Sequence, residues 1–294
     1  MISVPTLRPI DDLRPVRSDT LSRIPWLIHG FSTRTGGVST AYGGQALNLG
    51  YTKHDTHAAV DENRTLLLRT LGAVNADGTA WPLVRLRQIH SDIIHRIDHP
   101  PEHLLSGDGL VTSTPHLMLA VQTADCLPVL LADAKRKAVG AFHAGWRGTL
   151  ARIVEKGVGA MRLHFGSEPD DLRAAIGPGI ATCCYAVGQE VSEQFQSQFS
   201  YAAELFREVT ESDPVREKYP LLFMTARAPG HSDLGHTIYL DLREANRRQL
   251  LGAGLRPENI SALHFCTACR TDLFFSHRAE KGVTGRQMAV IAIT

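Results

Sequence analysis

The sequence predicts a mixed α/β fold in one domain, preceded by a polar N-terminal arm. Short apolar runs split by turn residues indicate buried strands, and amphipathic helical stretches are interspersed among them. The chain has 294 residues, of which 43% are hydrophobic and 21% charged, as is ordinary for a globular protein that can bury a core. We therefore expect an arm over residues 1–25 and a single domain over residues 26–294.

The first third of the chain contains the predicted arm and a set of short elements. The arm is polar and rich in proline over residues 8–23, which suggests that it lies on the surface. An acidic start followed by four leucines predicts a helix over residues 55–71. The other expected elements are strands over residues 28–32, 84–86 and 93–97, and a glycine-rich loop over residues 34–39.

The middle of the chain has the strongest pattern. Apolar runs predict strands over residues 110–112, 117–121, 127–131 and 139–142. The next helix has its apolar side chains on one stripe: Leu150, Ile153, Val154, Val158 and Met161. Further along we expect strands over residues 174–176, 221–224, 238–240, 260–265 and 289–293, helices over residues 188–199 and 242–251, and a long loop over residues 225–237.

Charge and composition exclude several functional classes. Lys and Arg number 31 against 30 Asp and Glu, so the chain has no basic field for nucleic acid. No apolar run approaches the ~20 residues of a membrane span, and the first residues carry charges and prolines where a signal peptide is apolar. The five cysteines include an adjacent pair, a poor disulfide framework. We expect a cytoplasmic protein and, since no heptad repeat occurs, a monomer.

Three side chains that can bind metal interrupt the apolar strand ends: His90, Cys126 and His143. If the strands over residues 127–131 and 139–142 are neighbours, Cys126 and His143 lie at the same edge of the sheet. Two imidazoles and a thiolate suit a catalytic zinc ion, because three protein ligands leave a fourth position for water. Zinc lowers the pKa of such a water towards ~7, which creates a nucleophile at neutral pH.

Other interpretations of these residues stay open at the level of sequence. A buried cysteine is more often a small apolar side chain, and a histidine at a strand end is more often only hydrogen bonded. Alternatively, His143 could act as the base for a Cys126 nucleophile. The CxxC pair Cys266 and Cys269 is weak evidence for metal or redox chemistry, and we expect Cys183 and Cys184 to be packed.

Glycines or turns flank several arginines, where a guanidinium could bind an anion with two hydrogen bonds. These are Arg34, Arg147, Arg278 and Arg286. The glycine-rich loop over residues 34–39 matches neither GxGxxG nor the Walker pattern, so a nucleotide-phosphate site of those two types is excluded.

A series of motifs resembles one family, the YfiH or laccase-domain proteins, also called polyphenol oxidases or peptidoglycan editing factors. The motifs are His29–Arg34, Gly36–Ser39, Leu47–Gly50, Glu62–Arg64, Gln88–Ser91, Ala124–Cys126, His143–Gly148, Ile176–Pro178, Cys184–Gly188, Leu240–Leu242, Cys266–Thr267, Phe274–Ser276 and Gly285–Gln287. The most specific is His-Ala-Gly-Trp-Arg-Gly with Ala-Asp-Cys upstream. The chain departs from the pattern at His277, at Cys269 and in the long loop over residues 225–237.

The resemblance implies a zinc site at His90, Cys126 and His143 and a single-domain, layered α/β fold similar to toxin-type cysteine hydrolases. It implies a purine nucleoside phosphorylase that uses phosphate and also deaminates adenosine and cleaves methylthioadenosine. Cys126 and His143 would be catalytic. Arg34 and Asn48 would join them in catalysis and, with Arg147, would contact substrate or phosphate.

The resemblance also allows other functions. A copper-dependent phenol oxidase is the first alternative, but no HxH pair of the kind that multicopper oxidases use occurs in the chain. A second is a cysteine or zinc hydrolase that edits peptidoglycan precursors. A binding protein without catalysis is disfavoured, since a partly buried His/Cys/His set is costly to keep without a ligand.

Overall fold

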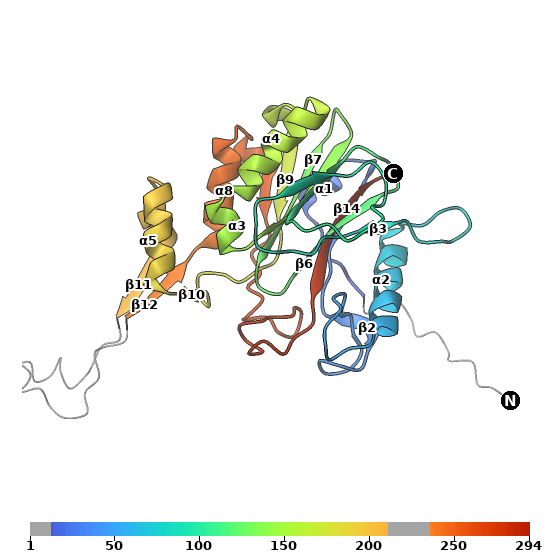
Figure 1. Cartoon of the computed structure of the whole chain (residues 1–294), viewed down its shortest axis with the longest axis horizontal. Helices are drawn as coiled ribbons and strands as arrows, with labels where there is room; N and C mark the ends of the chain where they lie inside the picture. Colours follow the sequence, from blue (N-terminus) through green and yellow to red (C-terminus); the bar gives the residue numbers. More distant parts are fainter. Residues whose placement is uncertain (1–12, 211–235) are drawn as a thin grey trace, which may run out of the picture. The chain divides into compact units, whose positions relative to one another are not determined.

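The computed structural model describes residues 13–210 and 236–294 of the chain (Figure 1). Contacts divide the chain into two compact units, one of residues 1–181 with 242–294 and one of residues 182–241. In the described part no helix is long and apolar enough to cross a membrane. Strands and helices alternate along the chain, so the predicted mixed α/β class is confirmed.

The first unit is built on two β-sheets. One has four strands in the order β1-β14-β6-β3, and the other has six in the order β13-β9-β7-β8-β5-β4. The strands of the first are β1 (Leu27–Phe31), β14 (Gln287–Ile293), β6 (Met118–Thr123) and β3 (Leu83–Val84). Those of the second are β13 (Ile260–Ala262), β9 (Leu172–Ile176), β7 (Leu127–Asp133), β8 (Ala138–Ala144), β5 (Gly109–Thr112) and β4 (Ile94–Arg96).

Apolar side chains from both sheets form the core between them. β6 and β14 contact β7 and β8. The shared cluster includes Leu119, Val121, Ala289 and Ile291 from the first sheet and Leu130, Ala132, Val139 and Ala141 from the second. Nearly all residues of β7 and β8 lie inside, and each such strand therefore reads as a continuous apolar run.

Helices cover the outer faces of the two sheets (Figure 1). On the four-stranded sheet, α2 (His57–Leu71) packs its leucines against Met118, Ala120 and Val290. On the six-stranded sheet lie α4 (Ile153–Phe165), which contacts β4, β5 and β8, and α8 (Leu242–Gly252), which contacts β9 and β13. The unit thus has a helix, sheet, sheet, helix layering.

The β7–β8 hairpin brings two predicted site residues together. The strands are antiparallel, with Leu127 opposite Ala144 and Pro128 opposite His143. Cys126 immediately precedes β7, so it reaches the end of the hairpin where His143 lies. The condition on which the expected meeting of Cys126 and His143 depended is therefore met.

Three sequence predictions need correction. The helix expected after residue 148 is two helices, α3 (Trp146–Leu150) and α4, because Arg152 between them has a left-handed φ of 64°. The expected loop over residues 34–39 contains strand β2 (Thr35–Ser39). The described part of the expected surface arm packs into the domain. Helix α1 (Asp19–Ser22) buries Leu21 completely, and Val16 pairs with Phe31.

The described residues of the second unit form a small antiparallel sheet and helix α5 (Gln189–Gln198). The sheet order is β10-β12-β11, with β10 (Ala186–Val187), β12 (His236–Leu240) and β11 (Phe206–Thr210). Helix α5 buries Val191 and Phe195. The predicted strand over residues 221–224 and most of the predicted loop over residues 225–237 lie outside the described residues, and residues 236 and 237 belong to β12.

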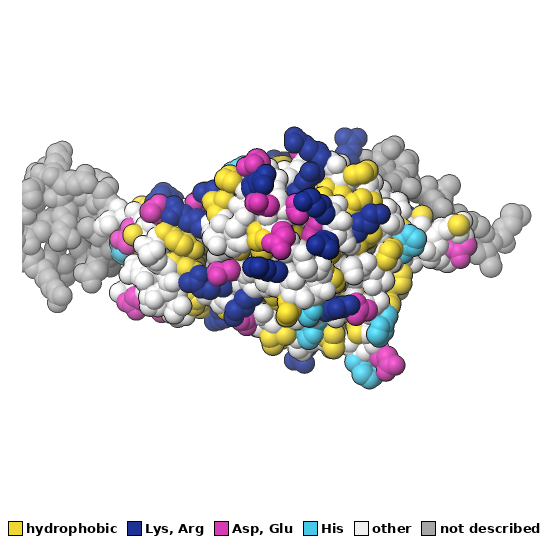
Figure 2. Space-filling model, turned by 90° about the horizontal axis from the view of Figure 1, so that it is seen from above, with side chains coloured by type: hydrophobic (Ala, Val, Ile, Leu, Met, Phe, Trp, Pro, Cys, Tyr) yellow, Lys and Arg dark blue, Asp and Glu magenta, His cyan; other side chains and the backbone are white. Residues whose placement is uncertain are grey.

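Charges of both signs are intermixed on one face of the molecule. Figure 2 shows dark blue Lys and Arg side chains next to magenta Asp and Glu side chains across the face it presents. The formal net charge of the chain is +1. On this face no field of one sign stands out that would favour a polyanionic partner.

Candidate metal centre

The structure brings His90, Cys126 and His143 together. Their ligand atoms all lie within 4.8 Å of one another, and Cys126 Sγ is 4.0 Å from His90 Nε2. The two imidazole rings meet edge to face, with centroids 5.0 Å apart. His90 is exposed, Cys126 is half-buried and His143 is buried, so the cluster opens to solvent on one side. The three residues predicted from strand ends therefore form one cluster.

Asp108, which sequence reasoning missed, supports this cluster from behind. Its Oδ1 accepts a hydrogen bond from His143 Nδ1 at 2.8 Å, which leaves His143 Nε2 for the cluster. Its carboxylate also accepts the backbone N–H groups of Ile89, His90 and Ser91, at 3.2, 3.1 and 2.7 Å. One fully buried carboxylate thus orients two of the three side chains. A carboxylate behind a ligating histidine is a recurrent feature of metal sites.

A sequence signal for Asp108 exists in retrospect. An acidic residue stands between Gly107 and Gly109 where a buried strand begins. A buried carboxylate requires hydrogen-bond donors around it, so an aspartate at such a position predicts nearby N–H or O–H groups. The donors come from residues 89–91 and 143, and the sequence does not reveal that pairing.

Electrostatics within the cluster favour a thiolate. Burial opposes ionisation of Cys126, but the adjacent His143 and His90 rings together outweigh it and lower the pKa of the thiol to about 6. Burial likewise disfavours the charged form of His143, but the Cys126 thiolate and the Asp108 carboxylate raise its pKa to about 9. Burial also opposes ionisation of Asp108, yet its bonds from His143 and Ser91 bring its pKa down to about 2.

Asp125 and Gly145 fix the position of Cys126. Asp125 accepts hydrogen bonds from the hydroxyls of Thr267 and Ser276, each at 2.7 Å, and from the backbone N–H of Arg278 at 2.6 Å. Gly145 lies so close to the cluster that a Cβ there would be 3.0 Å from Cys126 Sγ. A side chain at this position would therefore crowd the thiol and the His90 ring, and glycine avoids that contact.

The donors fit a zinc ion with an open coordination position. Two imidazoles and one thiolate converge, and Asp108 fixes the tautomer of one imidazole. Three protein ligands are the number used in catalytic zinc sites. The three-residue cluster is called the metal trio below.

Arg34 and Asn48 use their polar groups on the protein itself. Arg34 bonds to the carbonyls of Thr271 and Tyr42 at 2.7 and 2.9 Å and pairs with Glu280 at 3.1 Å. Asn48 is fully buried, and its side chain takes part in four hydrogen bonds that join residues 48–55 to Arg286. Both therefore hold loops together, and their role as substrate or phosphate contacts stays a prediction.

Among the three predicted substrate or phosphate contacts, Arg34, Asn48 and Arg147, it is Arg147 that has an exposed side chain. It lies in the first turn of α3, two residues after Gly145, and its guanidinium stacks on Trp146 with 4.3 Å to the ring centroid. Its role as a phosphate contact also stays a prediction.

The remaining cysteines differ in exposure. Cys266 is buried, with 9% of its surface exposed. Cys183 is exposed and Cys184 half-buried, so the expectation that both are packed is wrong. They lie on the turn of residues 182–184.

The fold and the metal trio define a family. Residues 28–294 match the family model described as multi-copper polyphenol oxidoreductase laccase. The chain belongs to this laccase-like YfiH family.

Named relatives and solved structures give the same result. A protein of Deinococcus radiodurans named purine nucleoside phosphorylase is 38% identical over 90% of this chain and 88% of its own length. Purine nucleoside phosphorylase YlmD of Bacillus subtilis is 30% identical, over 91% and 88%. The crystal structure of YlmD from Geobacillus stearothermophilus aligns with a TM-score of 0.76 at 28% identity, over 98% of each chain. The expected similarity to toxin-type cysteine hydrolases stays a prediction.

Proposed function

We propose that the protein is a zinc-dependent purine nucleoside phosphorylase that also deaminates adenosine and cleaves methylthioadenosine. The observation that carries the proposal is the convergence of His90, Cys126 and His143 within 4.8 Å, oriented by Asp108. Relatives that match about nine-tenths of the chain bear the name purine nucleoside phosphorylase. That name supports the substrate class, and the donor set supports the metal.

Zinc suits the metal trio better than copper. A blue-copper site adds a weak axial methionine to two histidines and a cysteine. Met118 and Met288 are instead packed in the core beneath α2. The chain also contains no HxH pair. The family description favours a copper-dependent phenol oxidase, which remains the alternative. The donor atoms of the metal trio favour a zinc enzyme.

The metal trio would hold zinc through Cys126 Sγ and one nitrogen of each histidine. Bound zinc would supply a Lewis acid that polarises an oxygen or lowers the pKa of a bound water. Because a ligating imidazole must be neutral, Asp108 keeps the remaining proton of His143 on Nδ1 and leaves Nε2 as the ligand. Exposed His90 faces the solvent side, from which a nucleoside can approach.

Phosphorolysis requires an anion to be held beside the nucleoside. A phosphate oxygen forms a bond to the ribose C1′, the bond from C1′ to the purine breaks, and the purine leaves with the electron pair and gains a proton. In this proposal Arg147 binds the phosphate through charge-assisted hydrogen bonds. In deamination, water adds at C6 of adenosine and ammonia leaves, so the same site then needs no phosphate.

A hydrolase that uses Cys126 as its nucleophile is the second candidate, and editing of peptidoglycan precursors is its form in this family. The observation that favours it is the pKa of Cys126, which burial raises but the neighbouring His143 and His90 rings together lower to about 6. A thiolate beside an imidazole is the arrangement that cysteine nucleophiles use. Activity in a fully metal-stripped protein that a thiol alkylator abolishes would identify this chemistry.

The proposed setting follows from composition. We infer a monomeric enzyme in the cytoplasm that acts on small molecules. The mixed surface charges and the net charge of +1 support the absence of a nucleic-acid partner. Sedimentation and fractionation test the monomer and the location.

The test is product analysis with adenosine. We would incubate the protein with adenosine, with and without phosphate, and separate adenine, inosine and hypoxanthine by chromatography, with Cys126→Ala alongside. Phosphate-dependent adenine, and inosine in both conditions, are expected from the wild type and not from the variant. No turnover of adenosine by zinc-loaded wild type would refute the proposal, and phenol oxidation by the copper-loaded protein would replace it.

A further inference from the structure

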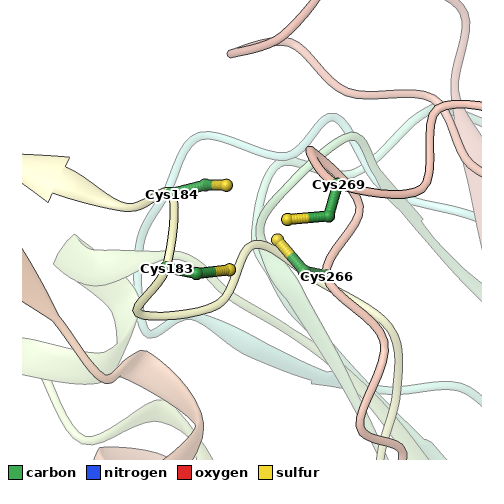
Figure 3. Close-up of side chains that lie close together, drawn as sticks. All are labelled: Cys183, Cys184, Cys266 and Cys269. Carbon is green, nitrogen blue, oxygen red and sulfur yellow. The ribbon is translucent and has the colours of Figure 1, made fainter.

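A second cluster of metal-binding side chains lies outside the metal trio. The sulfur atoms of Cys183, Cys184, Cys266 and Cys269 all lie within 4.8 Å of one another. Figure 3 shows the four side chains directed towards a common point from two turns. The turns cover residues 182–184 and 267–269, with Cys266 just before the second. The four residues are called the cysteine cluster below.

Chain continuity restricts where Cys183 and Cys184 can lie. The backbone N–H of Ala181 donates to Cys266 Sγ at 3.4 Å, and Gly179 pairs with Cys266 in an isolated β-bridge. Consecutive Cα atoms are ~3.8 Å apart, so residues two and three positions after Ala181 cannot lie far from that sulfur. The juxtaposition of the two turns therefore rests on hydrogen bonds between residues 179–181 and 266–267.

Four thiols in this arrangement suit one soft divalent cation. Zinc binds four thiolates tetrahedrally at ~2.3 Å, which places the sulfurs ~3.8 Å apart. The sulfurs here are separated by no more than 4.8 Å, so small side-chain adjustments suffice. A CxxC turn supplies two ligands in many structural zinc sites. The N–H group that Ala181 directs at Cys266 Sγ stabilises negative charge on that sulfur.

We propose that Cys183, Cys184, Cys266 and Cys269 form a structural zinc site separate from the metal trio. Four protein thiolates fill the coordination sphere, which leaves no position for substrate or water. The proposal stands on the geometry of the cysteine cluster and does not depend on the activity of the metal trio. It assigns a role to Cys269, the cysteine that departs from the family pattern.

The site would also support the loop that holds Cys126. Thr267 lies within the CxxC turn, and its hydroxyl donates to Asp125 at 2.7 Å. Asp125 directly precedes Cys126 in the chain. A metal that fixes this turn therefore stabilises the position of Thr267, and through it the Asp125 carboxylate.

The experiment separates the two sites by mutation and counts metal. In Cys126→Ala protein, purified folded without chelator, we expect one equivalent of zinc by mass spectrometry, held by the cysteine cluster. The double variants Cys126→Ala/Cys269→Ser and Cys126→Ala/Cys183→Ser should lose it. Cys126→Ala/Ala268→Ser is the matched control, because it adds the same hydroxyl to the CxxC turn without removing a ligand, and it should keep its zinc.

Two further readouts keep the test decisive if a double variant is poorly stable. Cobalt(II) in Cys126→Ala protein should give an intense near-ultraviolet thiolate-to-cobalt absorption. A strong chelator should lower the melting temperature of Cys126→Ala and expose four thiols to a thiol reagent. Folded Cys126→Ala protein that contains no metal, or whose intact mass shows a disulfide between these cysteines, would overturn the proposal.

Discussion

Asp108 is the residue on which the geometry of the metal trio depends most. Its carboxylate accepts hydrogen bonds from the backbone of residues 89–91 and from the His143 ring, and it is fully buried. An amide at this position would place an NH₂ group against N–H donors. It would also remove the charge that fixes the His143 tautomer.

Asp108→Asn should therefore weaken zinc binding by the metal trio about 10- to 100-fold, the usual effect of losing such a supporting carboxylate. Competition with a chromophoric chelator, in a Cys269→Ser background, measures this affinity. Asp98→Asn is the matched control, since that exposed carboxylate pairs only with Arg96 in the described contacts. Equal affinities of the two variants would show that Asp108 does not support the metal.

Arg147 is the residue to which we assign phosphate. Arg147→Gln should raise KM for phosphate about 10- to 100-fold, since a hydrogen bond to a charged group contributes about 1.5–3 kcal/mol. KM for the nucleoside should stay unchanged. Initial rates over a phosphate series measure the effect, with exposed Arg162→Gln on α4 as the control. A uniform fall in kcat without change in the KM for phosphate contradicts the assignment.

His29 makes stability depend on pH. It is 3% exposed and accepts the backbone N–H of Ser18 at 3.0 Å. Burial, helped by Arg17, lowers its pKa from 6.5 to about 4. In the unfolded chain His29 is therefore protonated below pH 6.5, whereas in the native protein it stays neutral down to about pH 4. The stabilisation by neutral His29 is complete above pH 6.5 and declines as the pH falls towards 4.

His29→Gln keeps a hydrogen-bond acceptor but removes this titration. Urea unfolding at pH 7, 6 and 5 should show the wild type losing up to about 1.4 kcal/mol more per pH unit than the variant below pH 6.5. Parallel pH profiles for the two proteins would mean that His29 titrates normally in the native state.

At the scale of the element, helix α4 shows how closely the layers are packed. A Cβ on Gly157 would lie 2.6 Å from the ring of Phe142 in β8, whereas a Cβ on Gly159 would meet nothing within 4 Å. Gly157→Ala should therefore destabilise the protein by about 1–3 kcal/mol through overpacking. Gly159→Ala should stabilise it by up to about 1 kcal/mol through helix propensity. Denaturant unfolding compares the two, and similar effects of both would refute this packing.

The same elements show what the sequence could predict. The apolar pattern predicts the strands β7 and β8, and their pairing, a condition that the sequence leaves open, brings Cys126 to His143. The break between α3 and α4 was missed because the apolar stripe continues across Arg152, whose left-handed φ no periodicity reveals.

Long-range contacts explain the other omissions. Asp108 has partners 17 and 35 residues away, and its function appears only when β5 and β8 are placed side by side. The cysteine cluster joins two pairs of residues more than 80 positions apart. In the sequence these are a single CxxC motif and a separate adjacent pair, and nothing in their spacing indicates that they meet. Local pattern identifies ligands at strand ends, whereas the residues that orient those ligands depend on tertiary structure.

At the scale of the whole molecule, the residues of the proposed active site lie in one of the two compact units. The metal trio, Asp108 and Asp125 all belong to the unit of residues 1–181 and 242–294. The family match extends over residues 28–294 and so includes both units. We therefore assign the proposed nucleoside chemistry to the larger unit, with zinc in the metal trio as its essential component.

The most direct test of this claim is a zinc titration of apoprotein in the Cys269→Ser background, with phosphate-dependent release of adenine from adenosine as the readout. Activity should rise in proportion to zinc and end at one equivalent. Copper should not replace zinc, and apoprotein with the additional Cys126→Ala change should stay inactive at every zinc concentration. Full phosphorolysis by the metal-free protein, or by that Cys126→Ala protein, would contradict a metal-centred nucleoside site.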